Sequence, residues 1–168
     1  MKLNNLGFSL LEILIYIAVI AVVTSAIGGI FLSVANGQAR ADAMAEVNSN
    51  LRFALDKINQ DISAASAITT PALAGDTSAT LALTSGASQI TYCIVDNQLR
   101  RGAGGICDGS SELITSQQVK INNLTFTRLE NTNSVLAKTI VSIQTVLTIS
   151  YNGANSAPIT KQITSSLP

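Results

Sequence analysis

An apolar segment near the N-terminus constrains the fold more than any other feature of the chain. Residues 8–34 read FSLLEILIYIAVIAVVTSAIGGIFLSV, and the 22 residues from Ile13 to Val34 carry no charge. As an α-helix these 22 residues would be about 33 Å long, enough to cross the hydrocarbon core of a bilayer. Residues 1–7, MKLNNLG, form a short polar leader whose only charge is Lys2. A positive charge before the span favours a cytoplasmic N-terminus, so the sequence predicts one membrane-spanning helix.

Glu12 lies inside this segment, and three interpretations of the segment treat it differently. A secretory signal peptide has a shorter apolar region of about 7–15 residues. A plain single-pass anchor fits the length but explains neither Glu12 nor the polar leader that ends in Gly7. A carboxylate in a membrane helix costs up to about 2.5–3.5 kcal/mol and usually has a partner. In the third interpretation, cleavage between Gly7 and Phe8 creates an α-amino group one helical turn before Glu12, and this cation is the partner.

The residues Gly7-Phe8-Ser9-Leu10-Leu11-Glu12 resemble the prepilin cleavage and methylation motif of type IV pilins and type II secretion pseudopilins. The resemblance covers the leader, the six motif positions and the apolar helix that follows them. It implies that a membrane peptidase cuts after Gly7 and methylates the new amine of Phe8. It also implies that Glu12 sets the register of the subunit against the Phe8 amine of a neighbouring subunit. The partners it implies are the prepilin peptidase, other pilin or pseudopilin subunits, the inner-membrane assembly platform, and membrane lipid before assembly.

Residues 35–67 are predicted to continue the helix as an amphipathic stem. Their apolar side chains recur every three or four positions, which is the pattern of one helix face; they are Val47, Leu51, Leu55, Ile58, Ile62 and Ala65. Polar residues such as Asp61 are expected off that face. The first proline is Pro71, so the helix is predicted to run from Phe8 to about Ala67. Because glycine weakens a helix by about 1 kcal/mol relative to alanine, bends or breaks are expected at Gly28-Gly29 and Asn36-Gly37.

Residues 68–168 are predicted to form a β-rich globular head. Residues 68–80 are rich in small and polar side chains and are expected to be a loop. Alternating patterns then predict antiparallel strands, with turns at Asp96-Asn97-Gln98 and Asn152-Gly153; the strands are expected at 80–84, 89–95, 99–101, 119–128, 139–151 and 158–163. The predicted fold class is therefore α+β, with a long N-terminal helix and an antiparallel sheet packed on its C-terminal half. The order of these segments resembles the heads of minor pseudopilins of the J or W type, which implies a minor or tip subunit.

The two cysteines of the chain, Cys93 and Cys107, are fourteen positions apart. In an exported domain this spacing predicts a disulfide that closes a surface loop. The chain-entropy model assigns such a loop about 3 kcal/mol. The alternative is two unrelated buried thiols.

The composition argues against several functional classes. The chain has ten basic and ten acidic residues, so no basic excess is present and direct nucleic-acid binding is not expected. It has no His, and two cysteines give too few ligands for a zinc site. Asp108 and Glu112 would supply at most half of a calcium site. With no nucleophile–base pair in view, we expect neither a metal, nor a cofactor, nor enzymatic activity.

The sequence therefore predicts a structural subunit of a type IV pilus or type II secretion pseudopilus. Before assembly it would be a single-pass protein of the cytoplasmic (inner) membrane with its head outside. After assembly it would belong to a cell-surface or periplasmic filament. Two alternatives stay open: a membrane-anchored extracytoplasmic binding module that does not polymerise, and a DNA-uptake pseudopilin.

Overall fold

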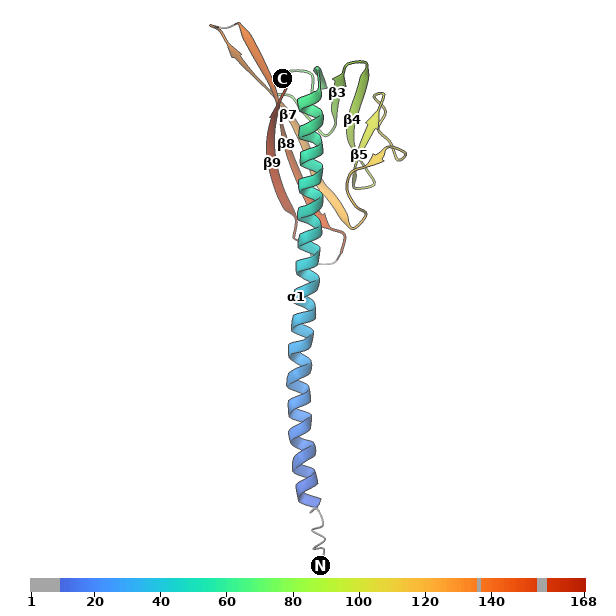
Figure 1. Ribbon diagram of the computed structural model, residues 1–168, viewed down its shortest axis with the longest axis vertical. Coiled ribbons are helices and arrows are strands. Elements are labelled where there is room, and N and C mark those ends of the chain that lie inside the picture. Colours follow the sequence, from blue (N-terminus) through green and yellow to red (C-terminus); the bar gives the residue numbers. More distant parts are fainter. Residues whose placement is uncertain (1–9, 136, 154–156) are drawn as a thin grey trace, which may run out of the picture. The chain divides into compact units, whose positions relative to one another are not determined.

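The computed structural model describes residues 10–135, 137–153 and 157–168 (Figure 1). The described residues divide between two compact units, the first ending at Asp42 and the second spanning Ala43–Pro168. The described part of the first unit consists of helix alone. This helix, α1, spans Leu10–Ala64 and continues through Gly28-Gly29 and Asn36-Gly37 without interruption. The predicted breaks at these glycines are therefore wrong. A glycine weakens a helix by only about 1 kcal/mol, and opening the helix would leave several backbone groups without partners.

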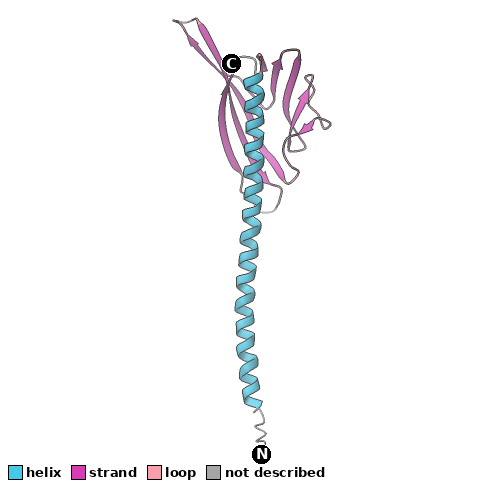
Figure 2. Ribbon diagram, viewed as in Figure 1, coloured by secondary structure: helices cyan, strands magenta, loops and turns pink. Residues whose placement is uncertain are grey.

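The second unit combines the C-terminal half of α1 with two antiparallel sheets, which Figure 2 shows as magenta strands beside the cyan helix. The five-stranded sheet has the order β1-β3-β4-β5-β6; its strands are β1 (Ala67–Thr70), β3 (Leu81–Ser85), β4 (Ser88–Val95), β5 (Gln98–Ala103) and β6 (Glu112–Leu113). The four-stranded sheet has the order β2-β7-β8-β9; its strands are β2 (Thr77–Ser78), β7 (Val119–Asn133), β8 (Lys138–Tyr151) and β9 (Ile159–Ser166). The predicted α+β fold is confirmed.

The core of this unit lies between α1 and the two sheets. All six apolar positions that define the predicted stem face are buried, from Val47 to Ala65. They meet buried side chains of both sheets, including Leu81, Tyr92 and Phe126. Burying a large apolar side chain stabilises a fold by about 1.5–3 kcal/mol. The helix face read from the sequence is therefore the surface on which the head is built.

The end of α1 differs from the prediction by three residues. Ala65 donates its N–H to the carbonyl oxygen of Ile62 at 3.1 Å, and the Ser66 N–H reaches the carbonyl oxygen of Thr84 at 2.7 Å. The chain thus leaves the helix after Ala64, and β1 begins at Ala67. Local pattern cannot show this change, because the backbone partner of Ser66 comes from a strand about twenty positions later.

Residues 68–80 are only partly the loop that was predicted, because most of β1 and all of β2 fall within them. Both strands are short edge strands, too short for an alternating pattern to appear. The predicted turn between β4 and β5 is confirmed: Asp96 and Asn97 both have positive φ, 52° and 61°, as a two-residue type I′ turn requires. The predicted pairing of residues 158–163 with the strongest strand is also confirmed, as β9 on β8.

Candidate functional site

The N-terminal half of α1 presents an apolar surface that nothing in the described molecule covers. Every described residue from Leu10 to Asp42 is exposed. The large apolar side chains among them range from 49% exposed at Ile13 to 80% at Leu10. The helix is long and apolar enough to cross a membrane, and no part of its most apolar window is buried. Such a surface requires lipid or other helices around it.

Two hydroxyl side chains within this surface are satisfied by the backbone of the helix itself. Thr24 donates its hydroxyl to the carbonyl oxygen of Ile20 at 2.7 Å, and Ser25 donates to that of Val22 at 2.9 Å. Hydroxyls satisfied in this way are compatible with a lipid environment. Glu12 differs: it is exposed in the first turn of α1, and no hydrogen bond or ion pair reaches it from any described residue. Gly7 and Phe8, the predicted cleavage and methylation positions, lie outside the described residues.

The head is fixed to the stem by a buried polar network centred on Asp61. The Tyr92 hydroxyl donates to Asp61 Oδ2 at 2.6 Å, and Arg101 Nε donates to the same oxygen at 2.6 Å. Arg101 also forms an ion pair with Glu112 at 3.4 Å. Tyr92 is fully buried, and Asp61 is 7% exposed. The carboxylate of one helix residue thus holds β4 and β5 against α1.

The position of Asp61 corrects the expectation that it lies off the buried face. Asp61 follows Ile58 by three positions and precedes Ile62, so its spacing also fits the apolar stripe. The expectation that Asp61 lies off the buried face rested on its polarity alone. A second polar contact on the same face was not predicted either: Asn50 Oδ1 accepts the Ser116 N–H at 2.7 Å. The signal in both cases is a polar residue in register with an apolar stripe.

The network shifts the acid–base behaviour of its members. Burial, and then the hydrogen bond to Asp61, raise the pKa of Tyr92 well above its usual value. The hydrogen bond to Asp61 also raises the pKa of Arg101, against the opposing effect of burial. Tyr92 is therefore held as a neutral donor and Arg101 as a cation, the protonation states that the geometry around Asp61 requires.

The raised pKa of Tyr92 predicts that the head becomes less stable in alkali. Above pH about 10 an unfolded tyrosine loses its proton, whereas folded Tyr92 keeps it. The folded state then binds more protons, so the contribution is fully present below pH 10 and declines above it, by up to about 1.4 kcal/mol per pH unit. Urea unfolding of the full chain in detergent between pH 8 and 11, with Tyr92→Phe as the reference, measures this. Equal pH slopes in the two proteins would contradict it.

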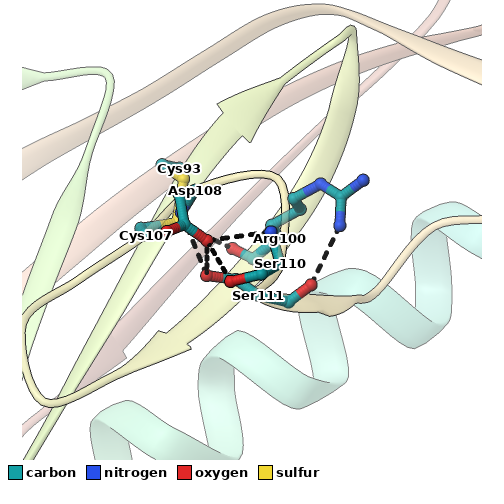
Figure 3. Close-up of a disulfide and its surroundings, with 6 residues drawn as sticks. All are labelled: Cys93, Arg100, Cys107, Asp108, Ser110 and Ser111. Atoms are coloured by element: carbon teal, nitrogen blue, oxygen red, sulfur yellow. Dashed lines mark hydrogen bonds between the residues drawn. A yellow bond between two sulfur atoms is a disulfide. The ribbon is translucent and has the colours of Figure 1, made fainter.

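The disulfide between Cys93 and Cys107 is present, as predicted (Figure 3). Cys93 lies in β4 and is 7% exposed, and Cys107 lies in the loop between β5 and β6. Beside it, the Asp108 carboxylate accepts hydrogen bonds from the backbone N–H and the hydroxyl of Ser110, at 2.8 and 2.6 Å. These bonds lower the pKa of Asp108. Arg100 donates to the carbonyl oxygen of Ser111 at 2.9 Å, closing the loop against β5 (Figure 3).

The two acids that were weighed as half of a calcium site serve other contacts. Asp108 caps the loop through Ser110, and Glu112 pairs with Arg101. Across the described ranges, no group of three or more His, Cys, Asp or Glu side chains is placed to hold a metal ion.

The arrangement therefore offers two features with functional meaning. One is an exposed apolar helix with an acid in its first described turn. The other is a head whose core is completed by the same helix. Comparison with protein-family models, with curated proteins and with solved structures finds no match to this chain.

Proposed function

We propose that the protein is a pilin-like structural subunit that assembles through its N-terminal helix into a filament of the type IV pilus or type II secretion pseudopilus kind. The observation that carries this proposal is the combination in one helix of an uncovered apolar surface and an acid, Glu12, at the start of its most apolar part. An anchor alone explains the apolar surface. It does not explain a carboxylate among side chains that would face lipid, because such a group needs a cationic partner.

In the proposed mechanism, the subunit first enters the cytoplasmic membrane with residues 1–7 inside and the head outside. A prepilin peptidase cleaves after Gly7 and methylates the amine of Phe8. Glu12 then pairs with the Phe8 amine of a neighbouring subunit, and the apolar surface passes from lipid to the helices of other subunits. The low dielectric of that environment strengthens the attraction between the amine and the carboxylate. No catalytic step by the protein itself is needed.

The place of the subunit in the filament follows from the resemblance of its head. The segment order that resembles minor pseudopilins of the J or W type favours a minor or tip position. The polar network at Asp61 and the Cys93–Cys107 disulfide support a rigid head. Such a head suits a subunit that is exposed outside the membrane.

The replacement Glu12→Gln tests the proposal. It removes the charge and keeps the shape, so membrane insertion should persist while the yield of sheared filaments falls at least about tenfold, as loss of a pair worth 1.4 kcal/mol or more would give. Asp42→Asn is the matched control, because Asp42 is also an exposed acid of α1 but lies outside the apolar segment 8–34 that contains Glu12. Normal filament yield in Glu12→Gln would favour the membrane-anchored module that does not polymerise.

Processing provides an independent readout in the same experiment. Mass spectrometry of the protein from membranes and filaments should find Phe8 as the first residue, carrying one methyl group on its amine. A mature protein that still begins at Met1 would contradict the proposal.

A further inference from the structure

Strands β7 and β8 extend beyond the rest of their sheet as a two-stranded arm (Figure 1, orange, upper left). They pair from Val119–Tyr151 to Asn133–Lys138, whereas β9 covers β8 only at Ser142–Ile149. On the other side, β2 pairs with Phe126 and Thr127, and the backbone of Arg128 bonds to Gly75 and Asp76. We define the arm as residues 129–135 and 137–141. No third strand in the described chain covers either of its edges, apart from one bond from Leu167 to Val141.

The arm combines exposed apolar side chains with strand edges that no described strand covers. Val135 is 90% exposed, Ile140 47% and Leu129 39%. A two-stranded ribbon alone in water is only marginally stable, and a free strand edge is a template for pairing with another chain. The arm would gain backbone hydrogen bonds and lose exposed apolar area if a strand were added to it.

The opposite edge of the same sheet is also open. β9 is the last strand in the order β2-β7-β8-β9, and no described residue pairs with its outer edge. Five of its eight residues are exposed. The chain therefore has two open strand edges in one sheet, one on the arm and one on β9.

We propose that the arm of one copy adds to β9 of a second copy, so that the four-stranded sheets of neighbouring heads become continuous. Charge complementarity selects this occupant. Glu130 is the only charged residue from Leu129 to Asn133, and Lys161 is the only charged residue of β9. Lys161 is exposed, and no described carboxylate pairs with it.

The two charges lie on the same face of the sheet. Side chains two positions apart along a strand share a face, so Glu130 lies on the face of buried Phe126. Lys161 is paired directly with buried Leu147, on that same face. Glu130 Oε1 already accepts Arg128 at 2.7 Å, which leaves the second oxygen of Glu130 for the Lys161 amine of the next copy.

This pairing has a defined register. Within one chain, Lys161 is level with Leu147, and Leu147 is level with Leu124. Glu130 lies six positions beyond Leu124, so placing it beside Lys161 of the next copy displaces that copy by about 20 Å along the strands. Because the contact joins two different edges, the arm of one copy and β9 of the next, it is heterologous and generates an open series of copies rather than a closed pair. The inference extends the proposed filament function, to which it adds contacts between heads.

Cysteine cross-linking of the full chain tests the inference. In the proposed register Asn131 lies beside Gln162 of the next copy, and both side chains are exposed. The double variant Asn131→Cys/Gln162→Cys, oxidised in membranes or filaments, should give a ladder of multimers that reduction removes. Asn131→Cys/Thr164→Cys moves one thiol about 7 Å along the strand and should give at least fivefold less product. Each single variant should give no ladder.

Charge reversal in the cross-linking background tests the pairing itself. Lys161→Glu should lower the yield about fivefold, the upper range for an exposed pair, and adding Glu130→Lys should restore it. Lys138→Glu is the control, because Lys138 lies on the other strand of the arm, and it should leave the yield unchanged. A dimer from Asn131→Cys alone, equal yields in both registers, or failure of the second reversal to restore the yield would overturn the inference.

The result separates the two proposals. Filaments that need Glu12 but show no ladder would overturn the contact between heads and leave the filament function intact. A ladder in membranes together with filament yield insensitive to Glu12→Gln would overturn the filament function and leave the contact between heads intact. The variants lie at exposed positions, and an unchanged urea midpoint confirms that each one folds.

Discussion

Replacing Asp61 by alanine should lower the free energy of unfolding of the head by about 3 kcal/mol, because it leaves a buried tyrosine hydroxyl and a cation without their acceptor. Asp61 Oδ2 accepts from both Tyr92 and Arg101 at 2.6 Å. Tyr92 is fully buried in the folded protein. Arg101 still reaches Glu112 at 3.4 Å, which keeps the loss below the largest values known for broken buried pairs.

Urea unfolding of the full chain in detergent, followed by tyrosine circular dichroism, measures this loss as a shift of the midpoint at constant slope. Asp56→Ala is the matched control: it removes the same group from an exposed position of the same helix. It should change stability by less than about 0.5 kcal/mol. Equal midpoints for Asp61→Ala and Asp56→Ala would show that the network around Asp61 does not hold the head.

Replacing Gly102 by alanine should be the second most damaging change, at about 2–3 kcal/mol. A Cβ at Gly102 would overlap the backbone carbonyl of Ile106, which a side-chain rotation cannot relieve. The turn that brings Ile106 back over β5 passes through Gly104 and Gly105, both with positive φ, 68° and 81°. Displacing this turn moves Cys107 away from Cys93, so disulfide formation should fall together with stability.

Gly109→Ala tests whether the effect belongs to Gly102 alone. Gly109 lies in the same loop, has no atom within 4 Å of an added Cβ, and does not have a positive φ. Its replacement should be neutral or slightly stabilising. Free thiols counted in denaturant without reductant should appear in Gly102→Ala and not in Gly109→Ala. Fully oxidised Gly102→Ala with normal stability would contradict the prediction.

Long periodic segments were predictable from the sequence because a buried face repeats along them. The stem face from Val47 to Ala65 and the strands β4, β7 and β8 were found in this way. The disulfide was found from spacing and context, since no competing cysteine exists. These features depend on local pattern or on a single possible pairing.

Features that depend on distant partners were not predictable. Asp61 belongs on the buried face only because Tyr92 and Arg101, 31 and 40 positions later, supply its hydrogen bonds. Without those partners, a carboxylate is correctly expected to face water. The projection of the arm depends on where β9 stops covering β8. That limit is a property of sheet register rather than of the arm's own residues.

The construction of the head around α1 has a consequence for the chain as it is being made. The stem emerges first, yet some of its contacts form only with β9, as in the hydrogen bond that Ser165 donates to Asn59 across 106 positions. Contacts between such distant residues form slowly, and apolar surface waiting for them invites aggregation. During translation the stem therefore remains only partly covered until about a hundred later residues have been synthesised. Early attachment of its apolar half to a bilayer would keep nascent copies apart in that interval.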